Sequence, residues 1–310
     1  MIQRILRQQP PAMQMLFLMS IWFLMQLLLA GAIPAVLQMT EGKGVTLELF
    51  SASPEKYPTA AVLLNLIGAI LLFLVPSTLF ARLANDRPAA FLGLNNRGNK
   101  SIIPWIIILG ICMMFFLPAI AEALQKIGLG QSADDMQKER QAMEAAYFVN
   151  NDIATLLRNI LLLALVPAFC EELFFRGILQ RFSFLLLKKK WPAIIFTSLI
   201  FAAIHNSIYN FLPIVIASCL LGYIYFSSGN LWMNILLHFV YNAAQVIVLY
   251  FVKNNKDFAA LAENNATFSF AAGAIALIIA IICVAIIHKK RTPLLLTDIM
   301  PIAPPSKEEY

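Results

Sequence analysis

The sequence predicts an all-α fold: a polytopic membrane bundle of about eight transmembrane helices. Three observations support this prediction. Of the 310 residues, 60% are apolar and 13% are charged, whereas an ordinary soluble domain carries about 25% charged residues. The mean hydropathy of +0.75 is too high for one buried core. The apolar residues also fall into runs close to the roughly 20 residues that a bilayer span needs. A soluble enzyme with one anchor and a secreted disulfide scaffold are therefore excluded.

Eight spans are expected along the chain. The first comes after Arg4 and Arg7, and it is longer than a signal-peptide core, so we interpret it as a retained helix. The fourth and fifth are separated by three consecutive lysines at 188–190. The eight runs are residues 13–37, 59–81, 102–124, 153–175, 191–205, 209–226, 231–252 and 268–288.

Two segments lie outside these runs. Residues 125–152 place charged and polar residues at helical spacing, which predicts an amphipathic or extramembrane helix near the membrane surface. Residues 292–310 contain four prolines and predict a disordered cytoplasmic tail. No internal repeat and no glycine-rich phosphate loop is evident. Residues 1–310 are therefore expected to form a single membrane domain.

The basic residues predict the orientation. They gather in the segments 82–100, 188–190 and 289–291, whereas the segment 38–58 holds three Glu and two Lys. Loops rich in Lys and Arg stay on the cytoplasmic side. This pattern predicts a multi-pass integral membrane protein with both termini in the cytoplasm. It also explains the net charge of +6 without a nucleic-acid partner.

Polar residues interrupt the apolar runs at three places. Glu171, Glu172 and Arg176 fall in the fourth run, His205 ends the fifth, and His238 with Asn242 lies in the seventh. An ionisable residue inside a bilayer costs about 2.5–3.5 kcal/mol, so each is a functional candidate. Taken singly, such residues can simply bond one helix to another. Their occurrence together on three spans favours a site.

Helical spacing assigns partners within this set. Glu172 and Arg176 are four residues apart and share a helix face, where they can form an ion pair. His238 and Asn242 share a face in the same way. Glu171 lies about 100° around the helix from Glu172 and can point elsewhere.

A depth argument predicts a long fourth helix. At about 1.5 Å per residue, His205 lies roughly 22 Å from Lys190 along the fifth span. If the fourth helix ended at Glu171, its carboxylate would lie at the membrane surface, far from His205. A helix that continues to about residue 187 places Glu171 near the level of His205. We therefore expect a long, tilted helix there.

These three segments resemble the signature of the CAAX prenyl endopeptidase family, also called the CAAX-protease and bacteriocin-processing family of intramembrane proteases. The pattern EExxxR, FxxxH and HxxxN occurs in the family's order, with Phe201 one turn before His205. The resemblance covers about residues 153–250, the expected catalytic core. It implies a membrane-associated peptide or protein substrate within the lipid bilayer, in some members a prenylated CAAX protein.

The resemblance also implies roles for these residues. Glu171 would be the general base, supported by Glu172 and Arg176. His205 would bind and polarise the attacking water, and His238 with Asn242 would stabilise the oxyanion. Burial raises the pKa of a carboxylate toward the range that a base needs, and an imidazole or amide can donate to an oxyanion.

The cofactor stays open at the level of sequence. Glu171, His205 and His238 would be the ligands if a divalent metal such as zinc is present, although the helical zinc motif HExxH is absent. A metal-free water held by Glu and His fits equally well. Two other functional classes are a non-enzymatic membrane scaffold or bacteriocin-immunity protein, and an ion-coupled transporter with a Glu–His proton relay.

Overall fold

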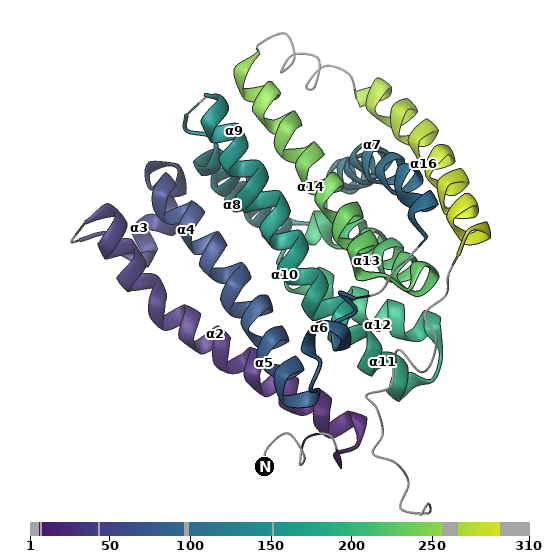
Figure 1. Cartoon of the computed structure of the whole chain (residues 1–310). Coiled ribbons are helices and arrows are strands. Elements are labelled where there is room, and N and C mark those ends of the chain that lie inside the picture. The colour runs from purple at the N-terminus through teal and green to yellow at the C-terminus, as the bar shows by residue number, and fades with distance from the viewer. Residues whose placement is uncertain are drawn as a thin grey trace, which may run out of the picture.

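Helices form the whole architecture of the residues that the structure describes. The structure is a computed structural model that describes residue 6 and residues 8–42, 44–95, 99–150, 152–255 and 266–291. No strand occurs in these ranges. The predicted all-α membrane bundle is confirmed (Figure 1). The expected disorder of residues 292–310 concerns a segment outside the described residues.

The helices appear in the following order along the chain. They are α2 (Pro11–Glu41), α3 (Leu47–Ala52), α4 (Pro58–Ala69), α5 (Val75–Ala84), α6 (Pro88–Phe91), α7 (Ile103–Ile127), α8 (Gln131–Tyr147), α9 (Ile153–Asn159), α10 (Val166–Phe174), α11 (Gln180–Leu187), α12 (Lys190–Ala203), α13 (Ile208–Ser228), α14 (Leu231–Asn254) and α16 (Ala266–Lys289). Within the described residues, seven continuous helical stretches are long and apolar enough to cross a membrane.

The fifth expected span differs from the other seven. Its helix, α12, has 14 residues and ends at Ala203, before His205. At about 1.5 Å per residue it is roughly 21 Å long, less than the hydrocarbon thickness of about 30 Å. His205 therefore lies in the turn after the helix rather than within a span.

The fourth helix is long, as the depth argument predicts. Helices α9, α10 and α11 form one continuous stretch of 35 residues, Ile153–Leu187, about 50 Å in length. Two π-helical segments, Ile160–Leu165 and Phe175–Leu179, lie on either side of α10, which carries both glutamates. Such π-helical turns are rare in proteins as a whole, and those that occur often lie at functional sites.

Proline accounts for two of the three π-helical segments found in the described residues. Pro76 lies two residues after the end of the π-helical segment Ile70–Leu74, and Pro167 lies two residues after the end of Ile160–Leu165. A proline in a helix removes one hydrogen bond, and its ring clashes with the carbonyl four residues earlier. In both cases that carbonyl lies inside the wider turn, which makes room for the ring.

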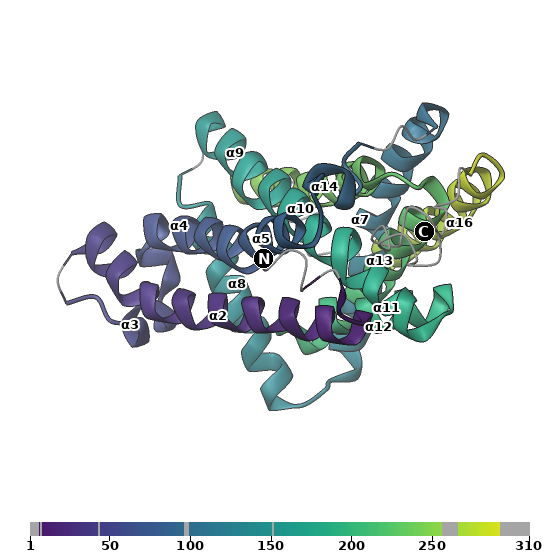
Figure 2. The same ribbon diagram turned by 60° about the horizontal axis from the view of Figure 1, so that its bottom comes forward.

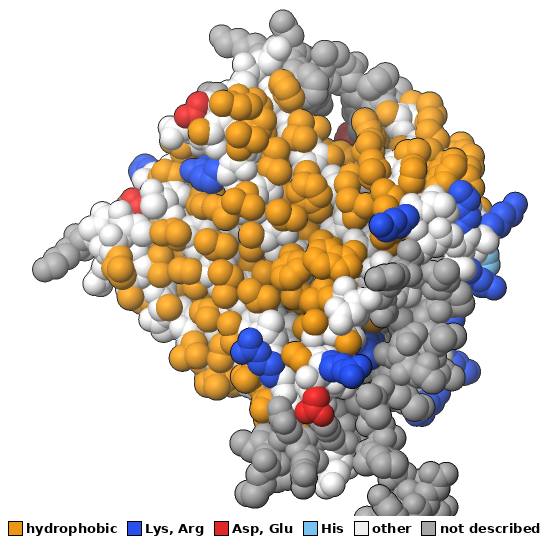
Figure 3. All heavy atoms as spheres, viewed as in Figure 1, with side chains coloured by type: hydrophobic (Ala, Val, Ile, Leu, Met, Phe, Trp, Pro, Cys, Tyr) orange, Lys and Arg blue, Asp and Glu red, His pale blue; other side chains and the backbone are white. Residues whose placement is uncertain are grey.

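Apolar side chains cover the outer surface, as a membrane protein requires. In Figure 3 a broad hydrophobic area extends over the face seen in Figure 1, and charged side chains gather near its margins. The exposed apolar surface of the molecule as a whole includes Phe23, Leu27, Ile278 and Ile281. Together with the seven apolar helices, it identifies an integral membrane protein.

Close helix packing positions α14 beside α7. A Cβ atom on Gly110 of α7 would lie 2.8 Å from Cγ1 of Val240 and 3.3 Å from the carbonyl oxygen of Leu237. The absence of a Cβ atom at Gly110 therefore lets the backbones of α7 and α14 approach each other at this point. Val240 lies two residues after His238, so this contact fixes the part of α14 that carries the histidine.

Helix α8 forms within residues 125–152, where a helix was expected, and packs against α4 and α13. Figure 2 shows it running from below α4 and α5, behind α2, to the lower edge of the molecule in that view. Asp134 near one end accepts a hydrogen bond from the Tyr209 hydroxyl at 2.6 Å. At the other end the Tyr147 carbonyl accepts bonds from Asn159 and Arg158, both at 2.8 Å. The helix is thus fastened at both ends to spanning helices.

Candidate active site

The predicted Glu172–Arg176 pair forms on the fourth helix and is fully buried. Arg176 Nη1 lies 2.8 Å from Glu172 Oε1, and neither side chain is accessible. Arg176 Nη2 also donates to the carbonyl oxygen and to the hydroxyl of Ser218 on α13. A buried pair requires such additional hydrogen bonds, because removing both charges from water is costly. The pair therefore bonds α10 to α13.

His238 lies between the two glutamates. Its Nδ1 is 3.0 Å from Glu172 Oε1, and its Nε2 is 3.9 Å from Glu171 Oε2. An ionised carboxylate can only accept, so Nδ1 carries a proton. If the ring is neutral, Nε2 carries the lone pair and can accept a hydrogen bond. If the ring is protonated, Nε2 donates toward the space beside Glu171. Glu172 thus fixes the orientation of the ring, and Glu171 faces its free nitrogen.

His205 approaches the same space from a tight turn. The turn runs from the end of α12 to Ser207, whose side chain caps α13. Asn206 adopts a left-handed conformation there, with φ 46°, which asparagine tolerates better than most residues. His205 Nδ1 donates to the Phe201 carbonyl oxygen at 2.6 Å. In the neutral ring, Nε2 is therefore free to accept a hydrogen bond from a water.

Phe201 covers these histidines on one side. Its ring lies 4.7 Å from the ring of His205 and 6.0 Å from that of His238, measured between centroids. The Arg176 guanidinium lies over the same ring at 5.0 Å. Phe201 therefore packs against both histidine rings and against Arg176.

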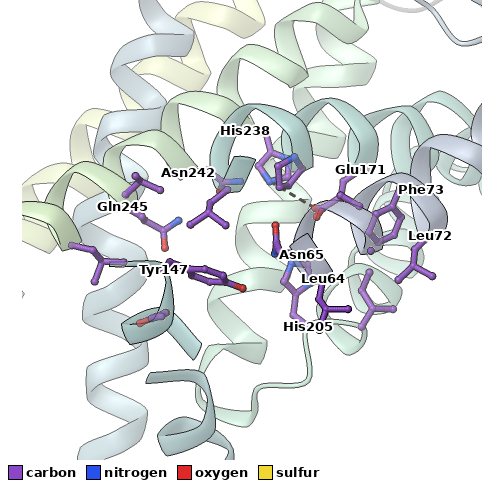
Figure 4. Close-up of a pocket in the computed structure, with 18 of the residues that line it drawn as sticks. Leu64, Asn65, Leu72, Phe73, Tyr147, Glu171, His205, His238, Asn242 and Gln245 are labelled. Carbon is purple, nitrogen blue, oxygen red and sulfur yellow. Dashed lines mark ion pairs between the residues drawn. The ribbon is translucent and has the colours of Figure 1, made fainter. Parts of the chain in front are cut away.

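A cavity of about 510 Å³ brings the predicted residues together. Glu171, His205, His238 and Asn242 all line it. Figure 4 shows their side chains around one space, with the dashed line joining His238 and Glu171. Glu172 and Arg176 are fully buried beside these four residues and do not line the cavity. The sequence-predicted set therefore divides into four residues at the cavity and two that support them.

Three buried polar atoms of this cavity's lining residues have no hydrogen-bond partner in the structure. They are Nε1 of Trp22, Oδ1 of Asn65 and Oε2 of Glu171. Buried polar groups are nearly always paired, so unpaired ones indicate a missing water or ligand. One donor and two acceptors match what a peptide backbone or a chain of waters offers.

Helix α8 contributes two ionisable residues to the same cavity, Glu144 and Tyr147. Burial raises the pKa of Glu144, and the Arg140 guanidinium, 2.5 Å away, opposes that shift. Burial also raises the pKa of Tyr147 to about 12, against a lowering effect of a hydrogen bond with Asn65. Tyr147 is therefore a neutral hydroxyl at physiological pH.

A second cavity, of about 400 Å³, lies on the other side of the same residues. It shares His205, His238, Asn242 and Gln245 with the first cavity, but Glu171 does not line it. Both cavities also reach the Arg140–Glu144 pair, because Arg140 lines the second and Glu144 the first. The two histidines thus stand between two cavities.

The three residues predicted as metal ligands do not form a metal-binding group in the described structure. No group of three or more His, Cys, Asp or Glu side chains that could hold a metal ion is found within the described ranges. Glu171, His205 and His238 line one cavity without forming such a group. Nδ1 of His205 and Nδ1 of His238 are already bonded to protein oxygens. A metal could then bind only through the Nε2 atoms.

Sequence reasoning missed several polar residues of the site. Asn234 on α14 donates to Glu172 Oε2 at 3.4 Å and to the Leu221 carbonyl oxygen at 2.6 Å. It lies one helical turn before His238, so the spacing that linked His238 to Asn242 could have revealed it. Trp22, Asn65 and Tyr147 gave no such signal, because they come from helices distant in sequence.

Comparison with known proteins finds a family model that matches the region carrying these residues. Residues 153–244 match the family model described as "Type II CAAX prenyl endopeptidase Rce1-like". The match contains Glu171, Glu172, Arg176, His205, His238 and Asn242. The resemblance predicted from these residues is therefore confirmed over this range.

One curated relative is similar over part of its length. The chain is 35% identical over 103 residues to the uncharacterized protein YpbD of Bacillus subtilis (strain 168). The similar region is 32% of this chain and 50% of YpbD, so the chain spans about half the length of that relative. No solved structure matches the chain.

Proposed function

We propose that this protein is an intramembrane endopeptidase, which hydrolyses a peptide bond of a membrane-associated substrate with a water activated by Glu171. The main support is the position of one atom. Oε2 of Glu171 has no hydrogen-bond partner in the structure and faces Nε2 of His238 at 3.9 Å across a cavity. A buried carboxylate with a free oxygen beside donors is a suitable general base.

The residues supply each proton transfer. A water held between Glu171 and Nε2 of His205 gives one proton to Glu171 as its oxygen attacks the carbonyl carbon of the substrate. The carbonyl oxygen becomes an oxyanion, which protonated His238 and the Asn242 amide stabilise by donating hydrogen bonds. Glu171 then gives the proton to the departing amine nitrogen as the carbon–nitrogen bond breaks.

The charge balance supports a protonated His238 in this scheme. Glu171 and Glu172 carry two negative charges, and Arg176 carries one positive charge. With a proton on His238, as the scheme uses it, the net charge of these four side chains is zero. The carboxylate on Nδ1 is the arrangement that stabilises an imidazolium in other hydrolases.

The two cavities support an extended substrate. A peptide whose scissile bond lies against His205 and His238 has one cavity on either side, with volumes of about 510 and 400 Å³. The unpaired atoms of Trp22 and Asn65 would bond the peptide backbone in the first cavity. Nothing in these contacts requires a prenyl group.

A cleavage assay tests this function. Purified protein in lipid nanodiscs is mixed with a library of fluorogenic membrane-associated peptides, prenylated and unprenylated. Glu171→Gln is nearly isosteric but cannot act as the base, so cleavage should fall by about 10²-fold or more. Glu144→Gln is a matched control, because Glu144 lines the same cavity but is paired with Arg140.

Each result has a defined meaning. Cleavage by the wild type and the Glu144 variant, but not by the Glu171 variant, supports the proposal. Near-normal cleavage by Glu171→Gln removes Glu171 from the mechanism. No cleavage of any peptide by the folded wild type favours the scaffold hypothesis.

A further inference from the structure

A separate cavity of about 180 Å³ lies where α12 begins and where α13 and α16 end. Lys190, His288 and Arg291 line it, and among the residues that the structure describes no Asp or Glu does. It shares no lining residue with the two cavities of the candidate active site. Its ionisable groups are therefore all bases, apart from the Tyr223 hydroxyl.

A hydrogen-bonded chain orients the side chains of this cavity. Arg291 Nη1 lies 3.3 Å from Nε2 of His288, and Nδ1 of the same ring lies 2.5 Å from the Tyr223 hydroxyl. A guanidinium can only donate, so Nε2 accepts and the ring proton is on Nδ1. That proton points at the Tyr223 oxygen. The Tyr223 hydroxyl hydrogen is then free to donate to a ligand.

Stacked rings place the cavity at the membrane surface. Trp191 stacks on Tyr223 with centroids 5.9 Å apart, and Tyr223 stacks on His288 at 6.3 Å. Trp191 is 57% exposed and stands at the start of an apolar helix, beside three lysines. Tryptophan and tyrosine concentrate at the level of lipid headgroups, and Lys and Arg flank the spans there.

Apolar surface continues from the cavity toward the middle of the bilayer. Ile195 and Leu199, one and two turns after Trp191 on α12, are exposed, as is Ile281 on α16, two turns before His288. A ligand with a negative headgroup and long acyl chains can therefore place each part against matching surface.

We propose that this cavity binds the phosphate group of an anionic phospholipid. Lys190 and Arg291 would neutralise the phosphate, and the Tyr223 hydroxyl would donate to one of its oxygens. Basic pockets between membrane helices bind lipid headgroups in this way. The ligand would hold the ends of α12, α13 and α16 together.

Thermal unfolding in detergent tests the proposal. Added phosphatidylglycerol should raise the melting temperature of the wild type by about 2–4 °C or more, since a ligand that binds the folded state stabilises it. Phosphatidylcholine and inorganic phosphate are the comparison ligands. We expect little shift from either, because the first carries no net charge and the second has no acyl chains.

A pair of double variants separates a specific site from general attraction. Lys190→Gln with Arg291→Gln removes two charges that line the cavity. Lys189→Gln with Lys289→Gln removes two exposed charges of the same surface that do not line it. The first should lose most of the phosphatidylglycerol shift, and the second should keep it. Tyr223→Phe, which removes one hydroxyl, should lose part of it.

Different results would contradict the existence of the site and its assignment to a lipid. An equal loss in both double variants, or no shift in the wild type, would overturn the proposed site. An equal shift from inorganic phosphate would overturn its assignment to a lipid. Because the readout is unfolding, these results are independent of whether the protein cleaves peptides.

Discussion

Nδ1 of His238 lies 3.0 Å from Oε1 of Glu172, the same oxygen that accepts from Arg176 Nη1 at 2.8 Å. One carboxylate oxygen thus joins the arginine of the fourth helix to the histidine of α14. The other ring nitrogen of His238 faces Glu171. The adjacent glutamates Glu171 and Glu172 therefore serve different parts of one imidazole.

The first prediction concerns the role of Glu172 through His238. Glu172→Gln keeps an oxygen acceptor but loses the charge that favours the protonated ring. Losing one oxyanion donor outright costs about 10²–10³-fold, so a weakened His238 donor should cost about 10–100-fold. We expect kcat for peptide cleavage to fall by that factor while KM changes little. To avoid an unpaired Arg176, the double variant Glu172→Gln with Arg176→Gln should be measured too. An unchanged kcat in both would contradict the positioning role.

Arg176→Ala is expected to act mainly on stability. It leaves Glu172 buried without its guanidinium and removes two hydrogen bonds to Ser218. Breaking a buried ion pair costs about 3–5 kcal/mol. Denaturant unfolding in micelles should show this loss, and adding Glu172→Gln should recover part of it. A stable but inactive Arg176→Ala protein would instead indicate that Arg176 acts directly in the chemistry.

The third prediction tests whether the cavity residues act as a unit. Single changes of His205, His238 or Asn242 to Ala should each reduce cleavage strongly, because each removes a donor or acceptor at the same reacting group. Residues that act together are non-additive, so the double variants should be little slower than the singles. Kinetics under saturating substrate would measure this. Rate losses that simply multiply in the doubles would show that the three act independently.

The sequence predicted more of the fold than of the site's surroundings. Apolar run lengths predicted the helices, and the four-residue spacing predicted the Glu172–Arg176 pair, since both signals are local. The end of α12 before His205 was not predicted, because a turn that uses Asn206 leaves a weak local signal. Trp22 and Asn65 were not predicted either. Their place at the cavity depends on how α4 packs against α10 and how α2 packs against α4, which no spacing along the chain encodes.

Trp22→Phe is the fourth prediction and concerns peptide binding. The change removes the unpaired Nε1 donor and keeps an aromatic ring. One hydrogen bond contributes about 0.5–1.5 kcal/mol, so kcat/KM should fall by roughly 2–10-fold, mostly through KM. Trp232→Phe is the control, since its Nε1 donates to the Leu94 carbonyl oxygen and Trp232 lines neither cavity. Equal effects of the two changes would argue against a contact between Trp22 and the peptide.

The π-helical segment Ile160–Leu165 is a place where the fourth helix could lose one residue without turning the rest of the helix. A π turn contains one residue more than an α turn, so deleting one of these six residues would restore the α-helical register and keep Glu171 facing α14, with the Pro167 ring again crowding the carbonyl four residues earlier. A one-residue deletion inside α10 would instead rotate the N-terminal part of the helix by about 100° relative to its C-terminal part. Homologous chains that differ by one residue in this helix should therefore carry the difference before Val166, and a cleavage assay on the two deletion variants would show which position tolerates the shorter chain.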